Sequence, residues 1–200
     1  SGSRTDVAAR VTFTPNDQIA LYVFGQGTIA RENLRENDRY GLGGAYDFGN
    51  GWSVAGEVSD GSLGEGGLIT ASYSDEAGNT RYLGYEIDPG RELGGIDLRG
   101  RDRGRVVAGM TSQVSDTVNT YGETTYDLFG KYRSLISAYG VTYTPNDVWS
   151  LTGAVEVGRV RDDEDYDFDR NALSFGTTYK DTQLSVAGRV EYRTEDGLRA

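Results

Sequence analysis

The segment that most constrains this chain is residues 141–157, VTYTPNDVWSLTGAVEV, which has the pattern of a β-hairpin. Apolar and polar residues alternate on both sides of a turn sequence, Pro145-Asn146-Asp147. Because successive side chains of a strand point to opposite faces, this hairpin has one apolar face and one face of small or polar residues. The turn recurs near the start of the chain, where residues 11–17 read VTFTPND.

The same alternation, interrupted by turn residues, continues along the chain and predicts about twelve strands. No segment of useful length has the 3.6-residue period of a helix. Since the commonest connection is the hairpin, the predicted fold is an all-β, antiparallel up-and-down meander. The expected strands span residues 7–14, 18–26, 39–48, 51–59, 67–74, 80–87, 105–113, 118–128, 134–144, 148–158, 171–179 and 183–193.

The connections alternate between short turns and mostly longer loops. In a meander, alternate connections lie at opposite ends of the strands, so one end is expected to carry tight turns and the other long polar loops. Bacterial outer-membrane barrels have this asymmetry. The short connections are 15–17, 49–50, 75–79, 115–117, 145–147 and 180–182, and the others are 27–38, 60–66, 88–104, 129–133 and 159–170.

Aromatic residues gather beside the short turns. Amphipathic rings favour a membrane–water boundary, which favours an aromatic girdle at this end of a transmembrane barrel. Aromatic residues also favour strand ends and turn-flanking sites in ordinary sheets, so that alternative stays open. The predicted girdle consists of Phe13, Tyr46, Phe48, Trp52, Tyr73, Tyr82, Tyr143, Trp149 and Tyr179.

Charged residues fall in mid-strand on the face opposite the apolar one. In a barrel this face would line the interior, where a ring of carboxylates would favour cations. The alternative is structural pairing of the carboxylates with Arg189 and Arg81. The candidate pore-lining residues are Asp47, Glu57, Glu86, Glu123, Glu156, Arg189 and Glu191.

Composition excludes several kinds of function. The formal net charge of -11 argues against a nucleic-acid partner. The chain has no Cys and no His, which removes disulfides, thiolate or imidazole metal sites, and nucleophiles that a His activates. No run of 18 apolar residues exists to form a membrane-spanning helix. No cofactor and no catalytic residue is predicted.

Two loops concentrate charge. In the acidic segment 159–170, RVRDDEDYDFDR, the carboxylates of Asp163, Asp165, Asp167 and Asp169 share one face of an extended chain and form a calcium candidate. The segment lacks the turn glycine of a calcium loop, so a solvated acidic loop is the alternative.

The second charged loop, residues 88–105, is basic. Its five arginines suit lipopolysaccharide phosphates, but they could instead fold inward over a pore, pair with the acidic segment or stay solvated in a flexible loop. They are Arg91, Arg99, Arg101, Arg103 and Arg105.

The chain also resembles itself. The TFTPND and TYTPND turns are followed by SVAGEV at 53–58 and SVAGRV at 185–190, so residues 11–58 are similar to 141–190 in order and spacing. We interpret this as extension of one β-domain, residues 1–200, by hairpins. The alternative is convergence of separate strands under the same alternating constraint.

Nearly the whole chain resembles the transmembrane β-barrels of Gram-negative outer membranes. Residues 39–61, RYGLGGAYDFGNGWSVAGEVSDG, and 139–158, YGVTYTPNDVWSLTGAVEVG, look like barrel segments of large, repeat-rich outer-membrane proteins. The resemblance implies an outer-membrane location, with the lipid bilayer and lipopolysaccharide as partners. Proteases and phospholipases of this fold use a His, which this chain lacks, so an enzyme is not expected.

Two features depart from that family. The chain ends in Gly197-Leu198-Arg199-Ala200 rather than on an aromatic residue, and periplasmic short turns would place both termini outside. We therefore expect a part of a larger barrel, whose remainder would be a partner.

The expected function is a passive pore or transport conduit with charged extracellular loops. The alternatives are a non-conducting scaffold or surface-interaction barrel, and a soluble all-β binding module.

Overall fold

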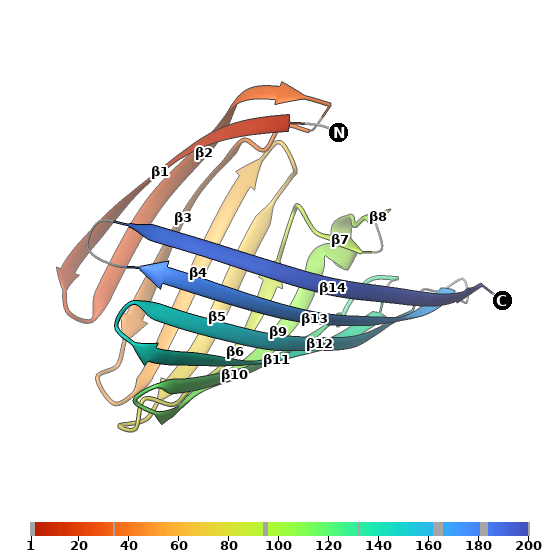
Figure 1. Cartoon of the computed structure of the whole chain (residues 1–200). Helices are drawn as coiled ribbons and strands as arrows, with labels where there is room; N and C mark the ends of the chain where they lie inside the picture. Colours follow the sequence, from red (N-terminus) through yellow and green to blue (C-terminus); the bar gives the residue numbers. More distant parts are fainter. Residues whose placement is uncertain are drawn as a thin grey trace. The chain divides into compact units, whose positions relative to one another are not determined.

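The computed structural model describes residues 3–33, 35–93, 96–131, 133–161, 166–180 and 184–199. Twelve antiparallel strands follow one another in chain order in one hydrogen-bonded sheet, which confirms the predicted meander (Figure 1). They are β1 (Ser3–Asn16), β2 (Ile19–Glu32), β3 (Arg39–Asp47), β4 (Trp52–Gly61), β5 (Gly66–Ser74), β6 (Thr80–Ile87), β9 (Gly104–Ser115), β10 (Val118–Tyr126), β11 (Arg133–Asn146), β12 (Trp149–Arg161), β13 (Tyr166–Lys180) and β14 (Ser185–Arg199).

Several strands are longer than the sequence predicted, and the largest extensions are toward the long connections. The expected loop 27–38 is strand as far as Glu32, and much of the expected loop 159–170 belongs to β12 and β13. For β12 and β13 the reason is cross-strand charge pairing, because Arg159 lies opposite Asp169 and Arg161 lies opposite Asp167. Opposite charges on facing residues stabilise a ladder that carries no apolar pattern.

The connection 88–103 is also more ordered than a solvated loop. It contains the two-residue strands β7 (Glu92–Leu93) and β8 (Ile96–Asp97) and the 3-10 helix η1 (Gly100–Arg103). Leu98 is 2% exposed and Arg91 is 6% exposed, so part of the segment is shielded from solvent. Of the alternatives that the sequence leaves open for this connection, a flexible solvated loop does not fit the described residues.

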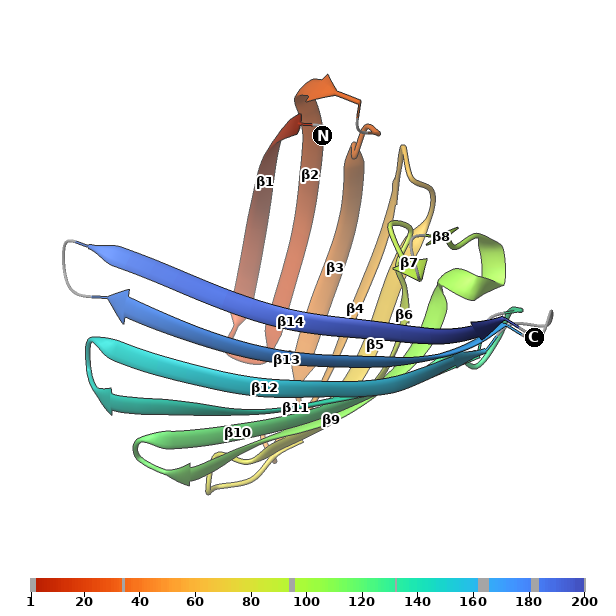
Figure 2. The ribbon, with the colours of Figure 1, turned by 45° about the vertical axis from the view of Figure 1, so that its right-hand side comes forward.

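The strands form two compact units, residues 1–73 with 84–104 and residues 74–83 with 105–200. Figures 1 and 2 show the β9–β10 and β11–β12 hairpins of the second unit turning at the same end of their strands. Among the described residues, no helix is long and apolar enough to cross a membrane.

Exposure alternates along the strands of both units and defines two faces. On the apolar face, side chains such as Val58 (58% exposed) and Val190 (75% exposed) are open. On the polar face, Glu57 and Glu156 are half-buried. Of the apolar side chains described, Leu98, Val160 and Phe168 are buried. The large apolar side chains of the strands therefore do not form a conventional packed core within the described chain.

The repeated turn sequence has the same structure in both copies. The Asn16 carboxamide oxygen accepts hydrogen bonds from the backbone N–H groups of Gln18 and Ile19, at 3.0 and 2.9 Å. Asn146 does the same for Val148 and Trp149, at 3.1 and 3.0 Å. Each side chain closes its own turn, as Asn does in an Asx turn. The two turns thus share one pattern of hydrogen bonds.

The turn between β5 and β6 is closed by a carboxylate instead. Asp75 accepts hydrogen bonds from the Asn79 side chain at 3.0 and 3.2 Å, and from the backbone N–H groups of Asn79 and Ala77. These bonds, those of the Asn79 side chain first, hold the pKa of the Asp75 carboxyl below its usual value. Gly78, with φ of 82°, supplies the left-handed residue of the turn.

Replacing Asn79 by Ala is expected to raise the pKa of Asp75 toward its usual value, because the ionised carboxylate loses its main donors. A lowered folded pKa stabilises the fold above the usual carboxyl range, and that stabilisation is lost as the pH falls through the folded pKa. Carboxyl NMR titration of the detergent-solubilised protein measures the shift. Asn119→Ala in β10 is the control, and an unchanged Asp75 pKa in Asn79→Ala would contradict the assignment.

Candidate functional site

On the polar face of the first unit, the ring of a tyrosine lies across a glycine of the neighbouring strand. Tyr22 of β2 lies opposite Gly43 of β3, which lies opposite Glu57 of β4. The Tyr22 ring occupies the space that a side chain at Gly43 would need. Its hydroxyl donates a hydrogen bond of 2.7 Å to Glu57 Oε2. The bare glycine therefore allows one side chain to tie three strands together.

The second unit repeats this arrangement. The Tyr82 ring lies over Gly109 of β9, and its hydroxyl donates a hydrogen bond of 2.5 Å to Glu123 Oε2 on β10. Gly109 and Glu123 are cross-strand partners. We call each set of three residues a Tyr–Gly–Glu joint. Sequence reasoning missed both joints, although a Tyr, a Gly and a Glu on one face of three successive strands could have signalled them.

Two of the candidate carboxylates, Glu57 and Glu156, have arginine partners. The Arg39 guanidinium lies 3.4 Å from Glu57 and donates to Ser59 Oγ at 2.8 Å. Arg170 contacts Glu156 at 2.6 Å. Of the seven candidates, Glu57 and Glu156 are thus held by arginines that the sequence reading did not name.

Glu191 lies between Arg189 and Arg193, each at 2.7 Å. Arg81, proposed as a partner from the sequence, has the strand position of exposed Leu83 and belongs to the other face. Arginines therefore balance several polar-face carboxylates, which argues against a strong ring of negative charge.

The two remaining carboxylate candidates, Asp47 and Glu86, lie in different surroundings. Asp47 is exposed at the end of β3, and its carboxylate accepts a hydrogen bond of 2.7 Å from the Gly49 N–H in the short turn. This contact gives Asp47 a role in closing the turn. Glu86 is half-buried beside exposed Ile87, as expected for the polar face.

Two cations of the polar face lie over aromatic rings. The Arg10 guanidinium stacks 3.5 Å from the centroid of the Tyr22 ring, and the Arg10 side chain is exposed. Arg39 lies 5.6 Å from the Phe24 centroid. Such cation–π contacts hold guanidinium groups in place while leaving N–H donors available.

Most aromatic residues of the predicted girdle meet in pairs beside the short turns. Ring centroids are 5.2 Å apart for Trp52 and Tyr73 and 5.1 Å apart for Trp149 and Tyr179. Tyr46 and Phe48 form an edge-on pair at 4.8 Å.

Phe13 and Tyr143 are exposed on the apolar face as well. Tyr82 is the exception, because its hydrogen bond to Glu123 places it on the polar face. The girdle prediction is therefore wrong for Tyr82, since the alternation of β6 directs this ring to the other side.

The connection 88–103 packs on the polar face of the first unit. A side chain at Gly66 would meet Pro89 and Arg39 at 3.0 Å and Ser59 Oγ at 2.8 Å, so these groups surround one point. The Arg91 guanidinium donates to the Asp102 carbonyl at 3.0 Å, and Arg103 donates to the Leu98 carbonyl at 3.1 Å. Arg91 and Arg103 thus hold the segment together, while Arg99 and Arg101 are exposed.

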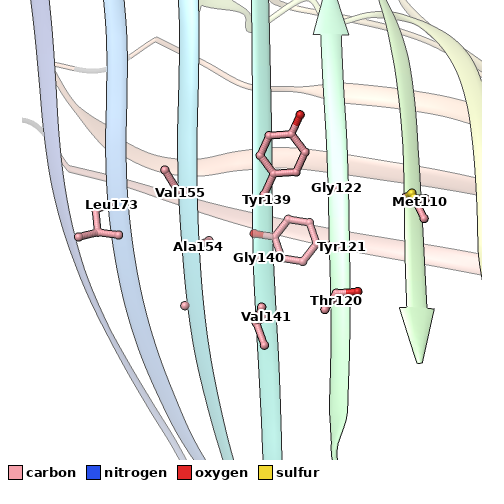
Figure 3. Close-up of a pocket in the computed structure, with 11 residues that line it drawn as sticks. Met110, Thr120, Tyr121, Gly122, Tyr139, Gly140, Val141, Ala154, Val155 and Leu173 are labelled. Carbon is pink, nitrogen blue, oxygen red and sulfur yellow. The ribbon is translucent and has the colours of Figure 1, made fainter. Parts of the chain in front are cut away.

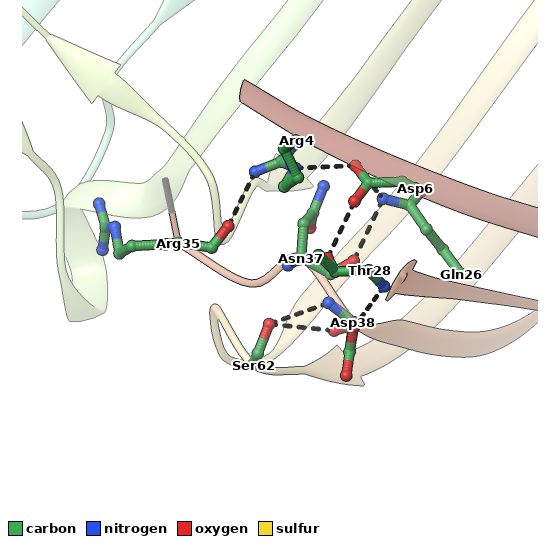
Figure 4. A network of polar contacts seen from close by, with 8 residues as sticks. All are labelled: Arg4, Asp6, Gln26, Thr28, Arg35, Asn37, Asp38 and Ser62. Carbon is green, nitrogen blue, oxygen red and sulfur yellow. Dashed lines mark hydrogen bonds and ion pairs between the residues drawn. The ribbon is translucent and has the colours of Figure 1, made fainter. Parts of the chain in front are cut away.

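Polar side chains also order the long-connection end of β1 to β4 (Figure 4). Asp6 accepts hydrogen bonds from Arg4 at 2.8 Å and from the Thr28 hydroxyl at 2.9 Å. Asp38 accepts from the Thr28 N–H at 2.7 Å, and its own N–H donates to Ser62 Oγ at 3.0 Å. This network holds the described part of the connection after β2 through polar contacts.

The calcium candidate is only partly described. Asp163 and Asp165 lie outside the described residues. Asp167 lies 2.9 Å from the Arg159 guanidinium and Asp169 lies 3.8 Å from it. Among the residues the structure describes, no group of three acidic side chains could hold a metal ion. The two described carboxylates bind arginine instead.

The apolar face of the second unit has a hollow of about 580 Å³ (Figure 3). Its walls include Met110, Tyr139, Val155 and Leu173. A side chain at Gly153 would meet nothing within 4 Å, which leaves the backbone bare there. The lining of the hollow is almost entirely apolar, so it offers few hydrogen-bond partners to a polar solute.

We expect Gly109→Ala to destabilise the protein, because the new methyl group displaces the Tyr82 ring and breaks its bond to Glu123. Loss of a hydrogen bond to a charged group costs about 1.5–3 kcal/mol in the free energy of unfolding. Tyr82→Phe should cost a similar amount, and the two changes should be less than additive because they remove the same bond. Urea unfolding in lipid vesicles measures these values.

Gly153→Ala is the matched control for this experiment, since its methyl group would meet nothing within 4 Å. Equal effects of Gly109→Ala and Gly153→Ala, or full additivity with Tyr82→Phe, would contradict the joint.

No protein-family model and no curated protein sequence matches this chain. A solved structure, the loop L8 deletion mutant of OmpT, an outer membrane protein of Vibrio cholerae, is similar with a TM-score of 0.51. The sequences are 13% identical, and the match covers 98% of this chain and 87% of that chain. At this identity the likeness concerns the fold alone. The chain has the fold of an outer-membrane β-barrel or of a part of one.

Proposed function

We propose that this chain forms the wall, or part of the wall, of an outer-membrane β-barrel that conducts small polar solutes passively. The observation that carries the proposal is that the sheet has one exposed apolar face and one polar face. The apolar side chains are exposed, as a lipid-facing surface requires, and the opposite face holds half-buried, paired charges. The bilayer would cover the first face, and water would wet the second.

The ordered ends of the strands support the same proposal. The aromatic pairs Trp52–Tyr73 and Trp149–Tyr179 suit a membrane–water boundary at the short turns. Exposed Arg99 and Arg101 suit the phosphates of lipopolysaccharide at the other end. The similarity in fold to an outer membrane protein of Vibrio cholerae agrees with a Gram-negative outer membrane.

The paired charges bear on ion selectivity. Glu57, Glu156 and Glu191 each have an arginine partner on the polar face. A lumen lined by such pairs has little net charge to attract one sign of ion. We therefore propose a weakly selective conduit in place of the cation preference that the carboxylates alone suggest.

Planar-bilayer recording of the full chain tests this function. We expect stepwise conductance and, in a KCl gradient, a reversal potential close to zero. Folding is checked first by heat-modifiable mobility on a gel. Folded protein without conductance would favour the non-conducting scaffold, and a soluble monomer in buffer without detergent would contradict the membrane assignment.

The connection 88–103 leads to a second prediction, which concerns the single-channel conductance. Because Pro89 lies against groups of the polar face, the segment 88–103 would narrow a lumen there. Replacing residues 90–101 by a short Gly-Ser linker should raise the single-channel conductance. Arg101→Gln, which changes one exposed charge and leaves the segment in place, is the control. Equal conductance of wild type and linker variant would place the segment outside the conducting path.

A further inference from the structure

A third tyrosine lies across a glycine on the polar face, and its acceptor is missing. The Tyr121 ring of β10 occupies the space that a side chain at Gly140 of β11 would need. Gly140 lies opposite Ala154 of β12, at the position that Glu57 and Glu123 take in the two joints. Within the described chain, no hydrogen bond engages the Tyr121 hydroxyl. The third joint therefore has its ring and its glycine but no carboxylate.

A hollow of about 330 Å³ opens where the carboxylate would be. It extends from Tyr121 over β12 and β13 to Arg189 of β14. A side chain at Gly176, in its floor, would come no closer than 3.6 Å to the Gly188 carbonyl oxygen. Small-molecule sites of proteins begin at about 300 Å³, so the hollow suits a single small solute.

The groups around the hollow define the chemistry of that solute. Thr152, Ser174 and Thr178 supply hydroxyls, and no carboxylate is among the lining side chains described. Arg189 bonds Glu191 through Nη2 at 2.7 Å and is 68% exposed, so other N–H donors of its guanidinium remain available. Since Glu191 is shared with Arg193, two cations face one anion here. The patch has an excess positive charge.

We infer that this hollow binds a small hydroxylated carboxylate, such as a sugar acid. The carboxylate of the ligand takes the place of the missing Glu and accepts a hydrogen bond from the Tyr121 hydroxyl. The Arg189 guanidinium, at the other end of the hollow, donates to a hydroxyl at the far end of the ligand. The hydroxyls of the ligand bond those of Thr152 and Ser174. The inference deepens the proposed function, because it names a class of solute for the conduit and rests on a water-accessible polar face.

Calorimetry with the detergent-solubilised full chain tests the site, with D-glucuronate, D-glucose and acetate as probes. We expect D-glucuronate to bind about tenfold more tightly than either other probe, because it alone has both the carboxylate and the ring hydroxyls. Arg189→Gln should weaken D-glucuronate binding about tenfold. Arg193→Gln, which removes a charge from the same Glu191 outside the hollow, should change it by less than about twofold.

Ala154→Glu is the complementary variant. It supplies the missing carboxylate of the third joint, so it should abolish D-glucuronate binding while the protein keeps its heat-modifiable mobility. Equal binding of D-glucuronate and D-glucose, equal losses in Arg189→Gln and Arg193→Gln, or retained binding in Ala154→Glu would each overturn the site. Binding without bilayer conductance would refute the conduit and keep the site, and conductance without binding would do the reverse.

Discussion

The structure depends on the strict two-residue alternation of an antiparallel ladder. Once the β2–β3 and β3–β4 registers are set, Leu21 and Val23 share one face, and Tyr22 reaches Glu57 on the other. A shift of one residue would exchange the two faces and bury charge among apolar side chains. The turns and the Tyr–Gly–Glu joints therefore matter because they fix the register in which neighbouring strands pair.

Much of this architecture was predictable from the sequence. Alternation and turn residues located the twelve strands, because they depend only on neighbouring residues. Strand ends were less accurate, since the extension of β12 and β13 comes from Arg159 and Arg161 facing acidic residues across the ladder. The order in 88–103 was missed because the burial of Leu98 and the hydrogen bonds of Arg103 are properties of the folded segment, not of any local pattern.

The polar-face residues show the same limit. The alternation put Glu57, Glu123 and Glu156 on one face correctly, but their partners depend on register. Tyr82 was assigned by its closeness to a turn, yet its place in the alternation of β6 directs it to Glu123. A carboxylate with an arginine partner adds little net charge to its face, whereas an unpaired carboxylate in mid-strand adds a full negative charge. Because Glu57, Glu156 and Glu191 each have an arginine partner, the polar face carries less unbalanced negative charge than its carboxylates alone suggest.

The turns at Asn16 and Asn146 have a consequence for how such a chain forms and lengthens. Each asparagine closes its turn through backbone groups two and three residues ahead, with no help from distant parts of the sequence. Contacts so close along the chain carry a low entropic cost of closure and form early. The turn of such a hairpin is therefore specified by the hairpin's own residues. Copying one into a meander adds two strands and preserves the direction and facing of every strand that follows.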